Sequence, residues 1–298
     1  MSFAFEPGQK VEASVRRIAG EEIAKALAAA EDEQQDIALL VHALRRRCKK
    51  LRGLLRLVRP AFSDYKMENR AFRDAARQLG NVRDAGAMVE TLDALLEFDR
   101  ELDAPMIGDA GHDLRVKLVE RAGAVHANRA ALLGDFRLAM AAAEKRVRRW
   151  RLDKGGFGAL EGGLVASYRG MREGLRLAAR SGKARDLHEW RKDTKHHWYH
   201  TRLLTPYAPT VLGTRAAQID QLGEWLGDHQ NLSVLAAHLQ RADSGVAPHT
   251  VEQVRATIGI KQAELERASL ALGRELVAER PVALGKRYRT YWNTSEQD

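Results

Sequence analysis

The sequence has little of what stabilises several large classes of protein. Cysteine occurs once, at Cys48, so neither an internal disulfide nor a cysteine-rich zinc site is expected. Only 7 of the 298 residues are proline and only 6% are aromatic, which argues against a large β-sandwich. No apolar run approaches the roughly 20 residues of a membrane-spanning helix, and residues 1–10 carry no signal-peptide core. We therefore expect a cytoplasmic protein that spans no membrane.

What the sequence does have is helical periodicity over nearly its whole length. Ala, Leu, Arg and Glu dominate, and the apolar pattern breaks at Gly, Pro and Asp. The pattern predicts an all-α fold with helices at about 9–30, 34–59, 65–79, 82–101, 106–150 (in one or two pieces), 160–181, 184–205, 210–226, 229–243 and 249–279. The basic run at residues 286–289 is interpreted as a solvated tail, with closure of a groove or contact with an anionic partner as alternatives.

The chain also contains an internal repeat. Residues 42–60 align without a gap on residues 188–206, at an offset of 146, and residues 79–84 align on 226–231 one position further along. In the first aligned pair of segments, 42–60 and 188–206, the histidine, four basic positions and the final proline match. We expect two duplicated four-helix-bundle units, residues 1–155 and 156–298, joined by the glycines near residue 155. Two basic helices related by duplication are expected to line one groove or central channel.

The repeated helix is amphipathic, with one apolar face and one cationic face. Between Arg45 and Arg59 there are eight Lys or Arg residues and no acid. Like charges three or four residues apart on a helix repel each other. A structural helix with a solvated face would have Glu residues among its basic residues. The row from His42 to Arg59 is about 25 Å long at 1.5 Å per residue. That length, together with a net charge of +9, points to a linear polyanion as the ligand.

The second copy repeats this pattern, and further basic residues on neighbouring helices are expected to add donors. Arginine's planar fork suits phosphate oxygens, and lysine adds a point charge. The candidate anion-binding residues are Arg17, His42, Arg45, Arg46, Lys49, Lys50, Arg52, Arg56, Arg77, Arg83, Arg169, Arg172, Arg176, His188, Arg191, Lys192, Lys195 and Arg202.

At these residues the sequence resembles the CHAD family, the conserved histidine α-helical domain. The family's basic-histidine pattern corresponds to His42, Arg45, Lys49, Lys50 and Arg52, and again to His188, Arg191, Lys195 and His196. The resemblance covers about residues 10–290. It implies an all-helical, pseudo-two-fold domain that binds inorganic polyphosphate in a central basic cavity and is associated with polyphosphate granules in bacteria. Because no positioned acid–base set is visible in the sequence, we expect no catalytic residue and no cofactor.

Three positions depart from the family pattern, and all lie in the second half. Trp198 stands where the pattern has a basic residue. Asn231 replaces the acid that Asp84 supplies in the first half, and Gln230 is uncharged where Arg83 is basic. We therefore expect the first half of the site to bind more strongly than the second.

Three other interpretations of these residues compete with polyanion binding. His196, His197 and His200 share one helix, but no Glu accompanies them in a zinc-protease pattern, so hydrogen-bonded interhelical histidines are favoured over a metal site. A metal-dependent phosphate-processing enzyme would need carboxylates around the cations, and only Asp84, Asp193 and Asp228 are near. Nucleic-acid binding fits the charge, but the first row has no aromatic residue for base stacking.

Overall fold

A computed structural model describes residues 3–32, 34–79, 83–123, 129–241 and 246–296, with the backbone alone at 83–85, 121–123 and 129–130. These residues form helices joined by short turns, and no strand occurs within them. The α-helices are α1 (Val11–Glu31), α2 (Ile37–Val58), α3 (Tyr65–Gln78), α4 (Arg83–Arg100), α5 (Ala110–Gly123), α6 (Arg129–Val147), α7 (Glu161–Ser181), α8 (Ala184–Leu204), α9 (Pro209–Leu239), α10 (Pro248–Leu276) and α11 (Pro281–Ser295). The expected all-α class is confirmed.

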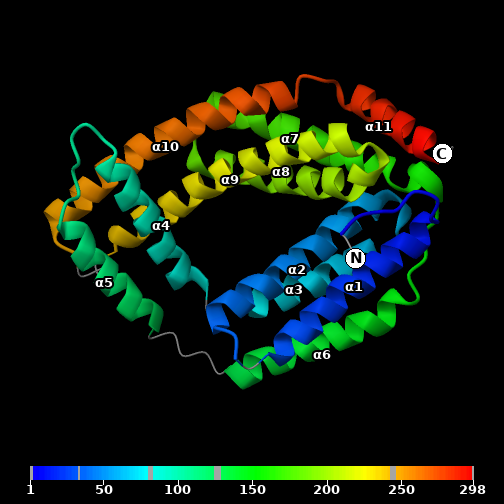
Figure 1. The fold of residues 1–298 in the computed structure, drawn as a ribbon, viewed down its shortest axis with the longest axis horizontal. Coiled ribbons are helices and arrows are strands. Elements are labelled where there is room, and N and C mark those ends of the chain that lie inside the picture. The colour runs from blue at the N-terminus through cyan, green and yellow to red at the C-terminus, as the bar shows by residue number, and fades with distance from the viewer. Residues whose placement is uncertain (1–2, 33, 80–82, 124–128, 242–245, 297–298) are drawn as a thin grey trace.

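The helices pack in two layers (Figure 1). One layer is a bundle in which α1 and α3 each pack on both α2 and α6. The other layer holds α7 to α11, with α8 between α7 and α9. A large apolar core joins the two layers. A second, smaller apolar core lies at the far end from α11, where α4 and α5 pack against α9 and α10. The α4–α5 pair therefore contacts helices on the other side of the expected boundary at residue 155.

Helix α2 is positioned by its apolar stripe. Its first turn is capped by Asp36, whose carboxylate accepts hydrogen bonds from the backbone N–H groups of Ala38 and Leu39. The apolar face that the amphipathic pattern predicts is fully buried and consists of Leu40, Leu44, Cys48, Leu51, Leu55 and Val58. Burial of this stripe leaves the opposite, cationic face directed away from the core of the bundle.

The structure corrects the sequence analysis at two places near the C-terminus. The two helices expected at 210–226 and 229–243 are one continuous helix, α9. Gly227 lies inside this helix and does not end it. A Cβ there would lie 3.1 Å from Arg191 Nε, so the glycine leaves room for the Arg191 guanidinium. The basic run at 286–289 is not a tail but part of α11, which buries Leu284, Tyr288 and Trp292. The region at 106–150 forms two helices, α5 and α6.

Within the described part of the chain, no helix is both long enough and apolar enough to cross a lipid bilayer.

Candidate functional site

The two repeated helices, α2 and α8, cross each other closely. A Cβ on Gly53 of α2 would lie 2.9 Å from the Cβ of Tyr199 of α8, so glycine is required at this contact. The His200 ring donates a hydrogen bond from Nε2 to the Gly53 carbonyl oxygen at 3.1 Å. Helix α7 also rests on α2, since a Cβ on Gly163 would lie 2.0 Å from the Leu57 carbonyl oxygen. The two cation-bearing helices are therefore neighbours and do not lie on distant surfaces.

Three arginines of the cationic row of α2 have no carboxylate partner among the described residues. Arg45 donates to the Ala76 carbonyl oxygen at 3.2 Å, and Arg52 donates from Nε to Asn69 Oδ1 at 3.1 Å. Neither acceptor is charged. No ion pair to a described carboxylate is made by Arg45, Arg52 or Arg56, and the Nε atoms of Arg45 and Arg56 are buried without an acceptor. Buried donors that lack a partner are costly, so an anion at this row would be stabilising.

The electrostatics of Arg52 show how crowded this positive charge is. Burial, followed by the neighbouring Arg56 and Arg73 guanidinium groups, lowers the pKa of Arg52, and the nearby Tyr65 opposes them. Each of the lowering effects disfavours the charged form. A bound anion would reverse the sign of this environment.

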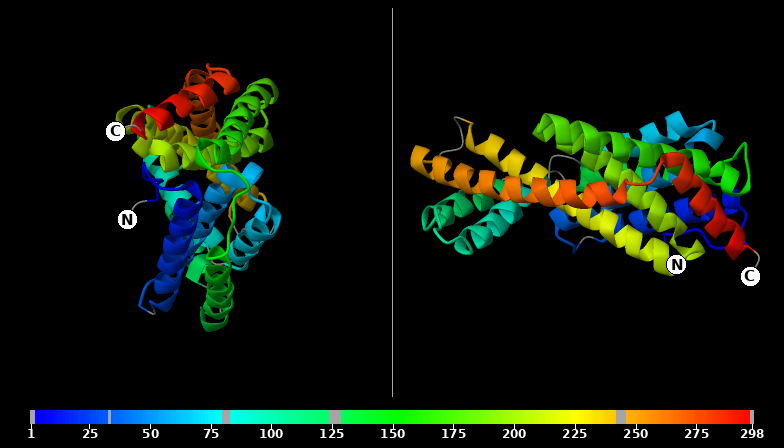
Figure 2. Two further views of the ribbon diagram at one scale, coloured as in Figure 1. Left: turned by 90° about the vertical axis from the view of Figure 1, so that its right-hand side faces the viewer. Right: turned by 90° about the horizontal axis from the view of Figure 1, so that it is seen from above.

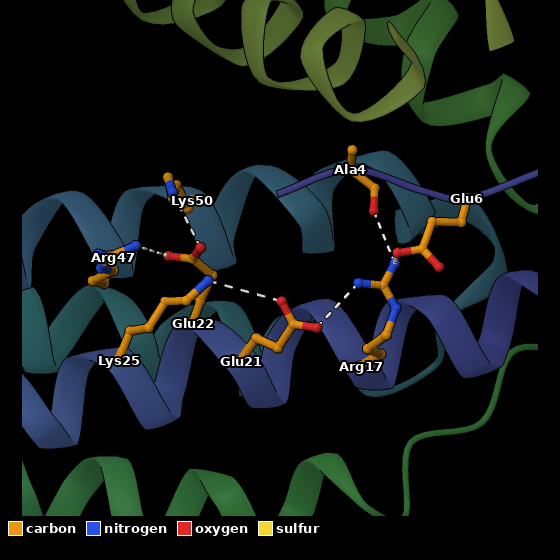
Figure 3. A network of polar contacts seen from close by, with 8 residues as sticks. All are labelled: Ala4, Glu6, Arg17, Glu21, Glu22, Lys25, Arg47 and Lys50. Atoms are coloured by element: carbon orange, nitrogen blue, oxygen red, sulfur yellow. Dashed lines mark hydrogen bonds and ion pairs between the residues drawn. The ribbon is translucent and has the colours of Figure 1, made fainter. Parts of the chain in front are cut away.

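The opposite flank of α2 is neutralised by a buried acid. The Glu22 carboxylate of α1 forms ion pairs with Arg47 at 2.8 Å and Lys50 at 3.1 Å, and its side chain is only 2% exposed (Figure 3). Burial lowers the pKa of Lys50, and Glu22 opposes that effect. Lys50, a candidate from the sequence, is thus anchored between α1 and α2. Arg46 beside it is exposed.

Arg17 is also held by other groups. Its guanidinium pairs with Glu21 at 3.1 Å and Glu6 at 3.3 Å and donates to the Ala4 carbonyl oxygen at 3.0 Å (Figure 3). These contacts tie α1 to the N-terminal segment. The structure does not bring Arg17 to the row on α2.

The cationic row of α8 is partly compensated. The Lys195 ammonium pairs with Asp220 at 2.9 Å and Glu224 at 2.6 Å, both from α9. Lys192 pairs with Glu189 at 2.7 Å. His188 Nδ1 and Arg191 Nε are buried without an acceptor, as on α2. The α8 row therefore offers fewer unpaired charges than the α2 row.

The remaining candidates are placed around these two helices. Arg202 lies over the Trp198 ring at 5.4 Å, with Lys195 over the same ring at 4.9 Å. Arg77 on α3 pairs with Asp74 at 3.0 Å and is largely exposed. His42 and Lys49 are exposed on α2. On α7, Arg169 and Arg176 are exposed and Arg172 is half-buried; the Arg83 side chain lies outside the described residues.

Two histidines of α8, His197 and His200, form hydrogen bonds between helices, which is the arrangement that the sequence analysis favoured. His197 and His200 are fully buried, and the Ser167 hydroxyl lies 3.2 Å and 2.8 Å from their Nδ1 atoms. Within the described residues, no group of three or more His, Cys, Asp or Glu side chains is arranged to hold a metal ion. Burial lowers the pKa of His200 from 6.5 to about 3, and that of His197 also lies well below 6.5.

These two histidines predict a loss of stability at mildly acidic pH. Because their folded-state pKa values are depressed, the unfolded chain binds more protons below pH 6.5, so stability is complete above that pH and falls as pH drops toward about 3. The linkage to His200 alone should lower the free energy of unfolding by roughly 1.5 kcal/mol between about pH 6.5 and 5. Urea unfolding at the two pH values measures this. The His200→Gln variant should show a smaller difference, and an equally stable wild type at both pH values would refute the assignment.

The fold and the site together define a class: an all-helical protein that presents a cationic row where two basic helices cross. A model of the CHAD domain matches residues 17–240, and the chain therefore belongs to the CHAD domain family. Two solved structures are similar, both with a TM-score of 0.58. "PptA from Streptomyces chartreusis" is 12% identical and the match covers 91% of this chain and 100% of that chain. The CHAD domain from the plant Ricinus communis is 16% identical, with 93% and 95% covered.

At these identities the two structures support the fold alone. No curated protein matches the chain in sequence.

Proposed function

We propose that the protein binds inorganic polyphosphate without cleaving it, through the row of cations on α2 with a smaller contribution from α8. The observation that carries this proposal is the set of Arg45, Arg52 and Arg56, three neighbouring arginines without a described carboxylate partner. Charge-assisted hydrogen bonds to phosphate oxygens would satisfy the buried donors. A linear polymer suits a row, and the CHAD resemblance implies polyphosphate as that polymer. The protein would then lie at polyphosphate granules where a cell has them.

Binding is proposed in preference to catalysis because the nearby carboxylates are dispersed. Asp193 lies 3.7 Å from His196 on α8, whereas Asp228 is on α9. The side chain of Asp84, the third candidate, is outside the described residues. Phosphoryl transfer usually requires carboxylates gathered around Mg²⁺, and the described residues form no such group.

We also propose that residues 1–155 and 156–298 are two related units around a pseudo-two-fold axis at the α2–α8 crossing. Gly53 and Tyr199, which contact each other there, are separated by the offset of 146 that relates the two repeats. The same offset relates the 3-10 turns that follow the two helices, Arg59–Ala61 and Thr205–Tyr207. Equivalent positions of two units contact each other where the two-fold axis passes between them, so the contact of Gly53 with Tyr199 supports an axis at the crossing.

The unequal charge of the two rows gives a prediction for the second half. Neutralising the acids that hold Lys195, in the variant Asp220→Asn/Glu224→Gln, should free its ammonium and strengthen polyphosphate binding several-fold, adding about one ion to the salt dependence. Titration of labelled polyphosphate into each protein measures this. The control Asp135→Asn/Glu252→Gln removes two exposed acids elsewhere. If the control strengthened binding equally, the effect would be one of net charge and the local explanation would fail.

A competition experiment at matched salt tests whether the protein prefers polyphosphate to nucleic acid. A labelled long-chain polyphosphate bound to the protein is displaced with single-stranded DNA, with both competitors expressed per phosphate. We expect DNA to displace it poorly, because the α2 row has closely spaced cations and no aromatic side chain for base stacking. Equal displacement per phosphate would contradict the polyphosphate proposal and leave a general electrostatic surface.

A further inference from the structure

A second row of cations lies on α3, next to the row on α2. It consists of Lys66, Arg70, Arg73 and Arg77, spaced four, three and four residues apart, so all four share one face of the helix. All four side chains are exposed. One acid, Asp74, lies among them and pairs with Arg73 and Arg77, each at 3.0 Å. Lys66 and Arg70 make no ion pair with a described residue.

The contacts between α2 and α3 place the two rows side by side. Arg45 reaches the Ala76 carbonyl oxygen and Arg52 reaches Asn69, while the Arg59 guanidinium lies 5.0 Å from the Tyr65 ring centre. The α2 row thus follows a line of α3 through residues 65, 69 and 76. Lys66, Arg70 and Arg77 each come one residue after a position on this line, and Arg73 comes one residue after position 72, between 69 and 76. One residue is a rotation of about 100° around the helix axis, so the α3 cations lie beside this line. Figure 2 shows α3 on the outside of the N-terminal bundle.

The equivalent surface in the second half has the opposite charge. At the offset of 147 that aligns Leu79 with Leu226, Arg73 corresponds to Asp220 and Arg77 to Glu224. These are the two acids of α9 that hold Lys195. In the second half, the neighbouring helix neutralises the cationic row, whereas in the first half it extends the positive surface.

We propose that the α3 row is a second binding surface for the same polyanion, so that a long phosphate chain held by α2 continues over Lys66, Arg70 and Arg73. This inference rests on the proposed function. The row from Lys66 to Arg77 is about 17 Å long and widens the positive surface beside α2. Like charges held side by side repel each other, and Asp74 offsets only part of the positive charge of the α3 row. A polyanion that covers both rows removes the remaining repulsion. Chains short enough to be held by α2 alone gain nothing from α3.

Charge reversal on α3 tests the inference. The variant Lys66→Glu/Arg70→Glu/Arg73→Glu is compared with Arg267→Glu/Arg274→Glu/Lys286→Glu, which reverses three exposed cations on α10 and α11 and changes the net charge equally. With long-chain polyphosphate, the α3 variant should bind at least roughly ten-fold more weakly, with a salt dependence smaller by about two ions. The control should change affinity much less. A short chain of about ten phosphates should be affected less by the α3 changes.

Each outcome decides one question. Equal losses in the two variants, or equal losses for long and short chains, would overturn the role of α3. If the wild type bound no polyphosphate at all, the proposed function itself would fail. If the wild type bound and only substitutions on α2 weakened binding, the proposed function would stand and the inference about α3 would be wrong. Circular dichroism and thermal unfolding confirm that each variant is folded.

Discussion

Reversing four charges of the α2 row, in the variant Arg45→Glu/Lys49→Glu/Arg52→Glu/Arg56→Glu, should abolish polyphosphate binding. The row then repels phosphate, and each lost contact also removes the release of a counter-ion that drives association. The affinity should fall by roughly three orders of magnitude or more, below what a titration detects. The measurement is a titration of labelled long-chain polyphosphate into wild type and variant at low salt.

The variant should remain helical, because the apolar stripe that places α2 is on the opposite face and is unchanged. Two controls separate charge from folding. The variant with Gln at the same four positions should bind weakly instead of being repelled. Reversal of Arg137, Arg267, Arg274 and Lys286, which are exposed on α6, α10 and α11, changes the net charge equally and should retain most binding. A quadruple α2 variant that is folded and binds like the wild type would contradict the proposed site.

Replacing Gly163 with alanine should strongly destabilise the protein. The added Cβ would lie 2.0 Å from the Leu57 carbonyl oxygen and 2.6 Å from that of Arg56, both backbone atoms of α2 that cannot rotate away. Helix α7 must then move off α2, and with it the α8 helix that packs against α7. We expect a loss of about 3 kcal/mol or more in the free energy of unfolding, measured by urea denaturation.

A glycine without neighbours supplies the control. Gly134 on α6 has nothing within 4 Å of its Cβ position, so alanine there should stabilise the helix by about 0.5–1 kcal/mol. The Gly163 variant should also lose affinity for polyphosphate under conditions where it is still folded, because the two rows separate. Unchanged stability of that variant would mean that α2 and α7 are not in the contact that positions the site.

Most of the helices could be predicted from the sequence because each one carries an apolar stripe and a local stop signal. The sequence wrongly predicts a stop at Gly227, because a glycine that ends a helix and one that makes room for a neighbouring side chain look alike in a single sequence. The structure distinguishes them by the Arg191 guanidinium beside Gly227. Similarly, the charges at 286–289 concealed a helix whose apolar positions, Leu284, Tyr288 and Trp292, recur every four residues.

For the site, the sequence predicts the cations but not what neutralises them. The α2 row is visible because all of its charges lie on one helix. The acids that compensate Lys50 and Lys195 come from other helices, Glu22 on α1 and Asp220 and Glu224 on α9, and no local pattern assigns such pairs. Of the α3 row, only Arg77 is among the candidates that the sequence predicts, although the spacing of Lys66, Arg70 and Arg73 is also visible there.

Titration of long-chain polyphosphate into the wild-type protein over a range of salt concentrations tests the central claim most directly. If phosphate contacts of the α2 row supply the affinity, the logarithm of the binding constant should fall linearly with the logarithm of salt, with a slope of about −2 or steeper for at least three contacts between about 50 and 200 mM salt. Absence of binding at the lowest salt, or an affinity that does not change with salt, would contradict the account.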